Sequence, residues 1–443
     1  LGHGLRREES RARDGDTSPP GTHLSEGDRF RPARGGAFPE HVEIVVKVTE
    51  RCNIACSYCY FFFKEDQTYA SRPAALSLDS CDALCRFLQE GVRECGLKSV
   101  RICFHGGEPL LMGRKRFDEV CRRITSAIGD QCWLRFTIQT NGMLIDDEWV
   151  ALISKWNSGV GISLDGEKSA NDAFRIDHKG RGTYERAAAG LKRLVKSGSE
   201  GRTERPSIIS VINPSASGGR TYEHFRSEFD VRNFSFLFLN ETHDTVTREI
   251  REGSFAFLEE LTLAWLKEGK RDVRIRMLSE NLACLMSDES MAALAPNKER
   301  LASVVSVRSD GDLGADDTVA ALSPSFASTN MNISDQSLAD VFRSPIWAEL
   351  DDALHRPPSE CRACEWYGLC RGGRIIHRYD KSGGFSQKSI YCDALKNLYT
   401  ILSAYVIKHG VPRDVLKARL ERSRGEALRV AEAHEAMSEG ARA

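Results

Sequence analysis

The sequence predicts an α/β fold built on an open parallel sheet with helices on its outer face. From residue 43 onward, strand-like runs alternate with amphipathic helical patterns six times in series, and repeated strand–helix units of this kind form parallel sheets. Six strands are too few to close an eight-stranded barrel, so we expect a partial (β/α)6 barrel. The 443 residues, 41% hydrophobic and 28% charged, allow one large core and a smaller appended unit.

The six strand candidates are short and rich in β-branched and aromatic residues, and they span residues 43–48, 99–104, 133–139, 160–164, 207–212 and 233–239. The helical patterns between and after them span residues 78–94, 116–128, 147–156, 184–196, 222–229 and 255–267. Ser77 precedes the first of these helices and is a suitable N-cap. Sites on such sheets lie at the carboxyl ends of the strands, which is where the motifs below are found.

Three cysteines follow the first strand within one short loop. Cys52, Cys56 and Cys59 form a CxxxCxxC pattern, and no fourth cysteine stands nearby. Three thiolates can hold three irons of a [4Fe–4S] cubane and leave one iron open for a small molecule, whereas electron-carrying clusters are normally closed by four. A structural zinc site is the alternative, but zinc knuckles usually pair two CxxC hooks, which this spacing fits poorly.

A glycine-rich turn follows the second strand. Gly106, Gly107 and Glu108 lie in the run His-Gly-Gly-Glu-Pro at residues 105–109. Two glycines allow the backbone to approach a ligand closely, and the adjacent carboxylate can pair with an ammonium group. A Gly-Gly-x-Pro sequence is by itself only a turn, but its place one helix and one strand after the cysteine loop makes a binding site the stronger interpretation.

The cysteine loop and the GGEP turn, in this order, resemble the radical SAM superfamily. The resemblance implies a partial barrel that binds a [4Fe–4S] cluster and S-adenosylmethionine, with the GGEP turn holding the methionine amino group. It further implies that Ser163 contacts S-adenosylmethionine, that Arg175 pairs with the methionine carboxylate and that Tyr58 lies against the adenine. Thr140 and Asn141 could donate hydrogen bonds to the nucleoside. Capping roles for Ser163 and Thr140, and a solvated Arg175, are the alternatives.

A second cysteine set lies near the C-terminus. It consists of Cys361, Cys364, Cys370 and Cys392. The spacing of these cysteines resembles that in the C-terminal auxiliary-cluster domain called SPASM. Four thiolates would close a second [4Fe–4S] cluster and suit an electron acceptor, with zinc as the alternative. Members with two auxiliary clusters carry a further cysteine at the position of Arg374 in this chain. They also carry cysteines in the segment that corresponds to residues 304–311, and this chain has no cysteine there. We therefore expect one auxiliary cluster and two clusters in all.

The resulting division of the chain has five parts. We expect a disordered N-terminal tail at 1–40, poor in apolar residues, a radical SAM core at 41–270, a bridging region at 271–345, a SPASM-like domain at 346–405 and a C-terminal helix at 406–443. The net charge of −1 favours neither nucleic acid nor a membrane surface as partner. No membrane span or signal segment is found, so the fourteen cysteines indicate a reducing cytoplasm.

Features of segments 65–73, 236–244 and 366–392 resemble peptide maturases that cross-link ribosomally made precursor peptides into cyclophanes, although that family has Pro-Asp where this chain has Leu239-Asn240. The resemblance implies that a 5′-deoxyadenosyl radical abstracts a hydrogen from a β-carbon, that the carbon radical attacks an aromatic ring, and that the auxiliary cluster accepts the second electron. Asp165, Asp244 and His377 are candidates for the base that takes the ring proton. All three also have structural interpretations.

Two kinds of alternative remain. A radical SAM thioether former, an epimerase or a sulfatase-type maturase would share the cofactors and differ in product, and a non-catalytic iron–sulfur or zinc scaffold would not cleave S-adenosylmethionine. The expected partners are a precursor peptide and an external one-electron reductant. About 40 residues precede the first strand, too few for an N-terminal winged-helix peptide-binding domain. The peptide would therefore add a strand to a sheet edge, or a separate protein would deliver it.

Overall fold

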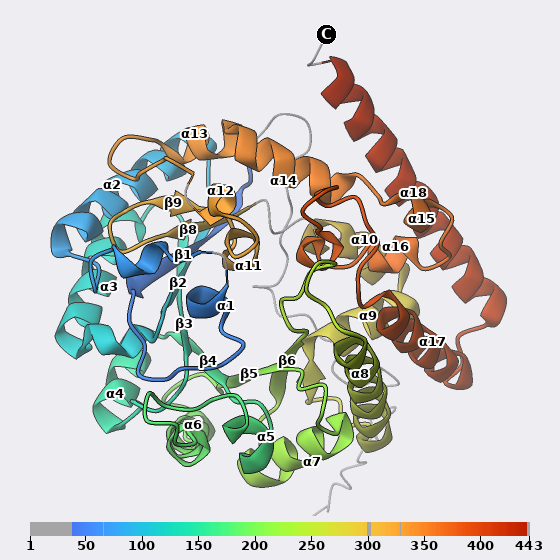
Figure 1. Cartoon of the computed structure of the whole chain (residues 1–443), viewed down its shortest axis with the longest axis horizontal. Coiled ribbons are helices and arrows are strands. Elements are labelled where there is room, and N and C mark those ends of the chain that lie inside the picture. The colour runs from blue at the N-terminus through green and yellow to red at the C-terminus, as the bar shows by residue number, and fades with distance from the viewer. Residues whose placement is uncertain (1–37, 65, 299–302, 328, 441–443) are drawn as a thin grey trace, which may run out of the picture.

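The computed structural model describes residues 38–64, 66–298, 303–327 and 329–440, and its centre is one curved sheet (Figure 1). The sheet order is β7-β6-β5-β4-β3-β2-β1-β8-β9, with β9 antiparallel to β8 and the other neighbouring pairs parallel. The strands are β1 His41–Thr49, β2 Ser99–Gly106, β3 Trp133–Thr140, β4 Gly159–Ser163, β5 Ser207–Val211, β6 Asn233–Leu237, β7 Arg274–Ile275, β8 Val304–Val307 and β9 Leu313–Gly314.

Helices cover the convex side of this sheet, whereas the short α1 lies on the concave side (Figure 1). Up to the end of β6 the helical elements are α1 Tyr60–Phe63, η2 Thr68–Ala70, α2 Leu78–Cys95, η3 Pro109–Met112, α3 Arg114–Ile128, α4 Asp147–Lys155, α5 Lys168–Asp172, α6 Tyr184–Ser199 and α7 Gly218–Phe229. Beyond β6 they are α8 Arg248–Glu268, α9 Arg276–Met286, α10 Asp288–Lys298, α11 Asp317–Ala320, α12 Pro324–Ala327, α13 Leu338–Arg343, α14 Pro345–His355, α15 Ser359–Arg362, α16 Tyr367–Cys370, η5 Ile375–Arg378, α17 Cys392–Lys408 and α18 Arg413–Gly440.

The interior strand β1, between β2 and β8, shows why this sequence forms a parallel sheet. Ile44 and Val46 on one face are fully buried, and Val45 and Lys47 on the other are at most 8% exposed. Strands that are covered on both faces need near-continuous apolar runs, as in the sequence Glu-Ile-Val-Val-Lys-Val. The predicted N-cap of α2 is confirmed, since the Ser77 side chain accepts a hydrogen bond from Ser80 N.

The predicted fold class is confirmed, and all six predicted strands are present as β1 to β6. The structure adds β7, β8 and β9, all of which come from the expected bridging region. β8 pairs with β1 and so extends the sheet beyond the six predicted strands. β7 and β9 have two residues each, and a two-residue strand leaves no periodic pattern in a sequence.

The C-terminal region differs from the single helix expected at 406–443. The boundary at 405 falls inside α17, and the chain turns at residues 409–412 before α18 begins. Of the expected disordered tail, residues 1–37 lie outside the described part of the chain, and Phe38 packs on Phe342 with ring centroids 6.3 Å apart. Within the described ranges, no helix is both long and apolar enough to cross a bilayer.

Candidate functional site

The three loop cysteines lie where β1 ends at the concave side of the sheet. Cys52, Cys56 and Cys59 all line one cavity of about 750 Å³, and α1 begins directly after Cys59. The loop is held in place by a second segment, because Ala55 N donates to Ile176 O at 2.7 Å and Ser57 N donates to Phe174 O at 3.0 Å. These contacts fix the backbone between the thiols without using the thiols themselves.

The protonation of these thiols indicates what the loop can bind. Burial raises the pKa of Cys52 to about 12 and that of Cys56 to about 11, and it also raises the pKa of Cys59. Three adjacent thiolates, of which Cys56 is buried and the other two are partly buried, are unfavourable unless a positive group neutralises them, and a metal centre does so because it binds the deprotonated form. The donor set and its burial therefore fit an iron–sulfur cluster.

The GGEP turn packs directly against the backbone that leads to Cys52. A Cβ atom on Gly106 would lie 2.2 Å from Thr49 O, and one on Gly107 would lie 2.2 Å from Arg51 O, so neither position has room for a side chain. Gly106 also has a φ of +136°, which glycine adopts without strain. Gly107 N donates to Thr49 O at 3.0 Å, and the turn thereby fixes the rim of the cavity beside the cysteine loop.

Glu108 joins the ends of β2 and β3. Its carboxylate, in a residue only 1% exposed, accepts hydrogen bonds from Thr140 Oγ1 at 2.6 Å, Asn141 N at 2.8 Å and Leu110 N at 3.1 Å. Burial raises the pKa of Glu108, and these hydrogen bonds oppose that rise. A carboxylate has roughly four acceptor positions, so an incoming ammonium group can still be accommodated.

Three predicted residues from different parts of the chain meet beside the cysteine loop. The Tyr58 hydroxyl donates to Asp165, Arg175 Nη1 donates to the Tyr58 hydroxyl at 2.9 Å, and Arg175 Nη1 lies 4.0 Å from Asp165 Oδ2. Asp165 also accepts from Val211 N at 2.9 Å. Burial raises the pKa of Asp165, and Arg175 opposes this. Asp165 thus positions Tyr58 and Arg175.

The polar side chains at the ends of β3 and β4 also reach the cavity wall. Asn141 Nδ2 donates to Asn53 Oδ1 at 2.7 Å, which connects β3 to the cysteine loop. Gln139 Nε2 donates to Ser163 Oγ at 2.8 Å across neighbouring strands. Of the eight predicted S-adenosylmethionine contacts, the cavity wall includes Tyr58, Gly106, Gly107, Thr140, Asn141, Ser163 and Arg175, and Glu108 lies directly behind it.

The predicted bases lie in different surroundings. His377 lines the cavity and is 2% exposed, its Nε2 atom has no hydrogen-bond partner in the described structure, and burial holds its pKa well below the usual range. Asp244 is exposed and accepts from Lys381 N at 3.0 Å, so it stabilises a turn and does not face the cavity. Asp165 is occupied by Tyr58, as described above.

A buried polar network behind the cysteine loop was missed in the sequence. Lys47 is fully buried and forms an ion pair with Asp317, and its Nζ lies 3.0 Å from His105 Nδ1. Tyr60 and Ser306 donate to the same carboxylate at 3.2 and 2.9 Å. Burial alone would raise the pKa of Asp317, but Lys47 holds it below the usual range. The available signal was the lysine within the apolar run of β1.

The four C-terminal cysteines are gathered by three short turns. Cys364 N donates to Cys361 O, Cys370 N donates to Trp366 O, and Cys392 N donates to Ser389 O. Burial, followed by the neighbouring thiols, raises the pKa of Cys361 to about 12 and also raises that of Cys392. As in the first loop, a metal centre would offset the unfavourable free energy of bringing these thiolates together, so the donor set fits a four-thiolate site.

Arg378 holds the segment between Cys370 and Cys392 in place. Its guanidinium donates to the carbonyls of Phe385, Ala353 and Arg356 at 3.1, 2.8 and 2.9 Å. The residue is 2% exposed and interacts electrostatically with Cys361 and Cys370. A buried cation beside thiolates favours their charged form.

The positions that carry extra cysteines in two-auxiliary-cluster proteins have other roles here. Arg374 donates to Thr318 Oγ1 at 3.3 Å on the cavity wall, and residues 304–307 form β8. Lys47, Asp317 and Arg308 lie buried in this region. The space is therefore occupied by ion pairs and a strand.

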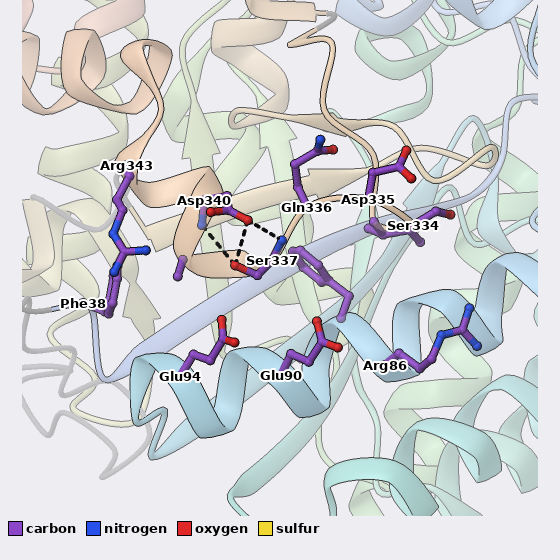
Figure 2. A pocket seen from close by; sticks show the side chains of 13 residues that line it. Phe38, Arg86, Glu90, Glu94, Ser334, Asp335, Gln336, Ser337, Asp340 and Arg343 are labelled. Carbon is purple, nitrogen blue, oxygen red and sulfur yellow. Dashed lines mark hydrogen bonds between the residues drawn. The ribbon is translucent and has the colours of Figure 1, made fainter.

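A second hollow, of about 720 Å³, lies between α2 and α13 (Figure 2). Glu90 and Glu94 face it from α2, and the Ser337–Asp340 hydrogen bonds drawn there form the capping box of α13. None of the predicted site residues lines this hollow, whereas the cavity at the strand ends is lined by most of them. The chemistry therefore identifies the cavity at the strand ends as the candidate site.

Comparison with known proteins agrees with this site. Residues 46–225, which include the first cysteine loop and the ends of β1 to β5, match the model of the Radical SAM superfamily. This segment has the radical SAM fold. The predictions of a radical SAM enzyme and of an iron–sulfur cluster with S-adenosylmethionine as cofactors are thereby confirmed.

Similar proteins include enzymes that mature sulfatases. A cysteine-type anaerobic sulfatase-maturating enzyme of Clostridium novyi is 22% identical over 366 residues, covering 80% of this chain and 93% of that protein. A serine-type enzyme of Bacteroides thetaiotaomicron is 24% identical over 415 residues, covering 86% and 96%. The solved structure of anSMEcpe with bound AdoMet and Cp18Cys peptide superposes with a TM-score of 0.69 at 20% identity, covering 83% of this chain and 98% of that one. This similarity shows that the fold outside the radical SAM domain is also shared.

Glu108→Gln should weaken binding of S-adenosylmethionine while leaving the iron content unchanged. The amide removes a charge that would pair with the ammonium group, and hydrogen bonds to charged groups contribute about 1.5–3 kcal/mol, which corresponds to roughly a 10- to 100-fold rise in Kd. Equilibrium dialysis of the reconstituted protein measures the Kd of S-adenosylmethionine. Glu90→Gln, in the second hollow between α2 and α13, is the matched control. An unchanged Kd would remove Glu108 from the binding assignment.

Proposed function

We propose that the chain is a radical SAM peptide maturase that abstracts a hydrogen atom from a β-carbon of a ribosomally made precursor peptide and closes a cyclophane onto an aromatic ring. The observation that carries this proposal is that one cavity is lined both by the first cysteine loop and by residues beside the second cysteine set. Cys52, Cys56 and Cys59 line one side, and Arg371, Gly373 and Arg374, next to Cys370, line another. Its volume of about 750 Å³ lies in the range of sites that enclose small ligands.

In this proposal the first loop holds the catalytic cofactors. Cys52, Cys56 and Cys59 would ligate three irons, and S-adenosylmethionine would be bound by Tyr58, Gly106, Gly107, Glu108, Thr140, Asn141, Ser163 and Arg175. When bound, the cluster and S-adenosylmethionine supply the radical that removes the hydrogen atom. The protein residues orient the reacting groups and exclude water, and the packing of the GGEP turn on the cysteine loop fixes the distance between the two binding sites.

The second cysteine set would hold a closed cluster that accepts an electron. Rearomatisation of the ring removes one proton and one electron, and a four-thiolate cluster beside the cavity suits that electron. Arg378 would favour its reduced form through its buried charge. The ion pairs and the strand at the positions of additional cysteines support one auxiliary cluster rather than two.

His377 is the candidate that best fits the proton acceptor. Of the three predicted bases it alone lines the cavity, and its neutral ring presents an unbonded Nε2 atom among the described residues. Its pKa is lowered by burial, which makes it a weak base. A ring carbon that has just formed a new bond and lost an electron is strongly acidic, so a weak base suffices.

Aldehyde formation on a cysteine or serine side chain is the second candidate function. The sulfatase-maturating relatives at 22% and 24% identity favour it. Both reactions begin with hydrogen abstraction from a β-carbon and need an acceptor for a second electron. They differ in whether an aromatic ring or a heteroatom captures the oxidised carbon.

The peptide is proposed to reach the cavity directly. Strand addition is disfavoured because the edge strands β7 and β9 have two residues each, and Leu313 N of β9 already donates to Met331 O at 2.8 Å. A separate delivery protein would then supply the affinity for the leader segment. An external one-electron reductant completes the set of partners. None of the fourteen cysteines, all of which lie in the described part of the chain, forms a disulfide, which suits a reducing, cytoplasmic location.

The product of the reaction separates these functions. The reconstituted protein, S-adenosylmethionine and dithionite are incubated with peptides encoded by short reading frames next to its gene. Cyclophane closure gives a product two hydrogens lighter that resists fragmentation between the joined residues and does not react with a hydrazide. A hydrazide-reactive product would support the aldehyde function, a lost alkylatable thiol a thioether, and an unchanged mass an epimerase. No cleavage of S-adenosylmethionine would indicate a non-catalytic scaffold.

Iron analysis tests the number of clusters. Anaerobically reconstituted protein should contain about eight irons per chain, because two cubanes hold four each. About twelve irons would contradict the interpretation of Arg374, and stoichiometric zinc with about four irons would show that the C-terminal cysteines hold zinc instead. Absorbance near the sulfur-to-iron charge-transfer band provides an independent check of cluster type.

A further inference from the structure

Three potential metal ligands outside both cysteine sites converge between two helices. Asp351 and His355 lie one turn apart on α14, and His434 comes from α18. His355 Nδ1 lies 3.3 Å from Asp351 Oδ1, and His434 Nε2 lies 3.0 Å from Asp351 Oδ2. One ligand atom from each of the three residues can be chosen so that all lie within 4.8 Å of one another.

The spacing agrees with what a metal ion of the zinc type requires. Tetrahedral bonds of about 2.0–2.1 Å place neighbouring ligand atoms roughly 3.3 Å apart, and the distance of 3.0 Å from His434 Nε2 to Asp351 Oδ2 lies close to this value. His355 Nδ1 lies 3.3 Å from Asp351 Oδ1 and also 2.9 Å from the Asp351 carbonyl oxygen, so this nitrogen binds an ion only by giving up the contact with the carbonyl. The imidazole rings are stacked, with centroids 4.8 Å apart and planes at 12°. The third pair, one nitrogen from each imidazole, lies within 4.8 Å, so the two rings would have to move closer together around a tetrahedral ion.

The surroundings complete the features of such a site. The second ring nitrogen of His434 lies 3.9 Å from Asp352 Oδ1, which is beyond hydrogen-bonding distance, so Asp352 contributes negative charge beside the site. The Asp351 side chain is 44% exposed, whereas the two histidines are 17% and 15% exposed. An ion can therefore reach the ligands from solvent, and a water molecule can take the remaining coordination position.

We propose that Asp351, His355 and His434 form a site for a divalent transition-metal ion, with zinc as the preferred ion. Two neutral imidazoles and one carboxylate are the donor set that such ions favour over magnesium or calcium. The ion joins α14 to α18, and its ligands Asp351 and His434 are 83 residues apart in the chain. It is distinct from the ions of the two cysteine sets.

The position of α18 indicates what this ion does. α18 packs on the loop that carries the auxiliary cysteines, because Ser423 Oγ donates to Gly368 O at 3.1 Å and a Cβ on Gly368 would lie 2.6 Å from Arg424 N. Arg362, next to Cys361, forms an ion pair with Glu435, which is adjacent to His434. A metal that fixes His434 to α14 holds this helix against the cysteine loop and protects the auxiliary site from solvent.

Zinc retention by the iron-loaded protein tests the site. Reconstituted protein is exposed to zinc, desalted and analysed for both metals, and the wild type should retain about one zinc per chain beyond its full complement of iron. His434→Gln and His355→Gln should each retain none while keeping the same iron content. His409→Gln, which removes an exposed imidazole that stacks on Tyr405, is the control and should behave as the wild type.

X-ray absorption at the zinc edge provides a measurement that does not depend on the variants. The bound zinc should show nitrogen and oxygen neighbours with imidazole scattering and no sulfur. Zinc that is absent from the wild type, bound through sulfur, or retained equally in His434→Gln would overturn the proposal. If either variant loses iron as well, the sulfur-free spectrum of the wild type still decides the ligand set.

Discussion

Cys56→Ala should abolish reductive cleavage of S-adenosylmethionine. Cys56 is the central thiol of the first loop, it lines the cavity, and its backbone is flanked by the hydrogen bonds of Ala55 and Ser57 to the segment 174–176. Two remaining thiolates cannot hold a cubane that leaves one iron open for S-adenosylmethionine. We expect 5′-deoxyadenosine to fall to the level of a reaction without protein, and about four irons, those of the second cluster, to remain.

Cys132→Ala is the matched control for this variant. Like Cys56, Cys132 forms no disulfide, but it is half-buried and lies directly before the start of β3, away from the carboxyl ends of the strands. The activity and iron content of Cys132→Ala should equal those of the wild type. Cleavage by Cys56→Ala at the wild-type rate would show that the first loop does not hold the catalytic cluster.

Cys364→Ala should separate cleavage of S-adenosylmethionine from formation of the peptide product. The segment 46–225, which matches the radical SAM model, includes Cys52, Cys56 and Cys59 and does not include the second cysteine set. 5′-Deoxyadenosine should therefore still form, whereas the modified peptide should fall by at least about tenfold, because the second electron has no acceptor close enough to the cavity. Mass spectrometry measures both products in the same reaction.

Loss of the peptide product has a second possible cause, which the structure allows us to separate. Cys361, Cys364 and Cys370 lie in the loop that α18 covers, and an unfolded loop would disturb the cavity wall at Arg371 and Arg374. Circular dichroism and peptide affinity distinguish a lost acceptor from a lost pocket. Modified peptide at the wild-type ratio to 5′-deoxyadenosine would show that the second cluster is not the electron acceptor.

Local sequence patterns predicted the fold and the motif residues at the strand ends that line the cavity. The six strands, their helices and the motifs at the strand ends could be recognised because each depends on short-range periodicity or spacing. The structure then brought Tyr58, Asp165 and Arg175 into contact, which follows from the meeting of strand ends at one edge of a parallel sheet.

Features that depend on distant pairings could not be predicted in this way. Lys47 and Asp317 are 270 residues apart, and nothing near Asp317 in the sequence indicates that its carboxylate pairs with a lysine in β1. β8 has four residues and acquires its strand conformation by pairing with β1. Asp244 was a reasonable base on sequence, but the turn at Lys381 binds it on the outside of the cavity.

Transfer of deuterium tests most directly whether this chain abstracts a hydrogen from a peptide β-carbon. The peptide identified by its mass change is synthesised with deuterium at its β-carbons and incubated with the reconstituted protein, S-adenosylmethionine and dithionite. The proposal predicts that 5′-deoxyadenosine gains one deuterium in step with the appearance of modified peptide. Unlabelled 5′-deoxyadenosine, formed together with fully modified peptide, would contradict it.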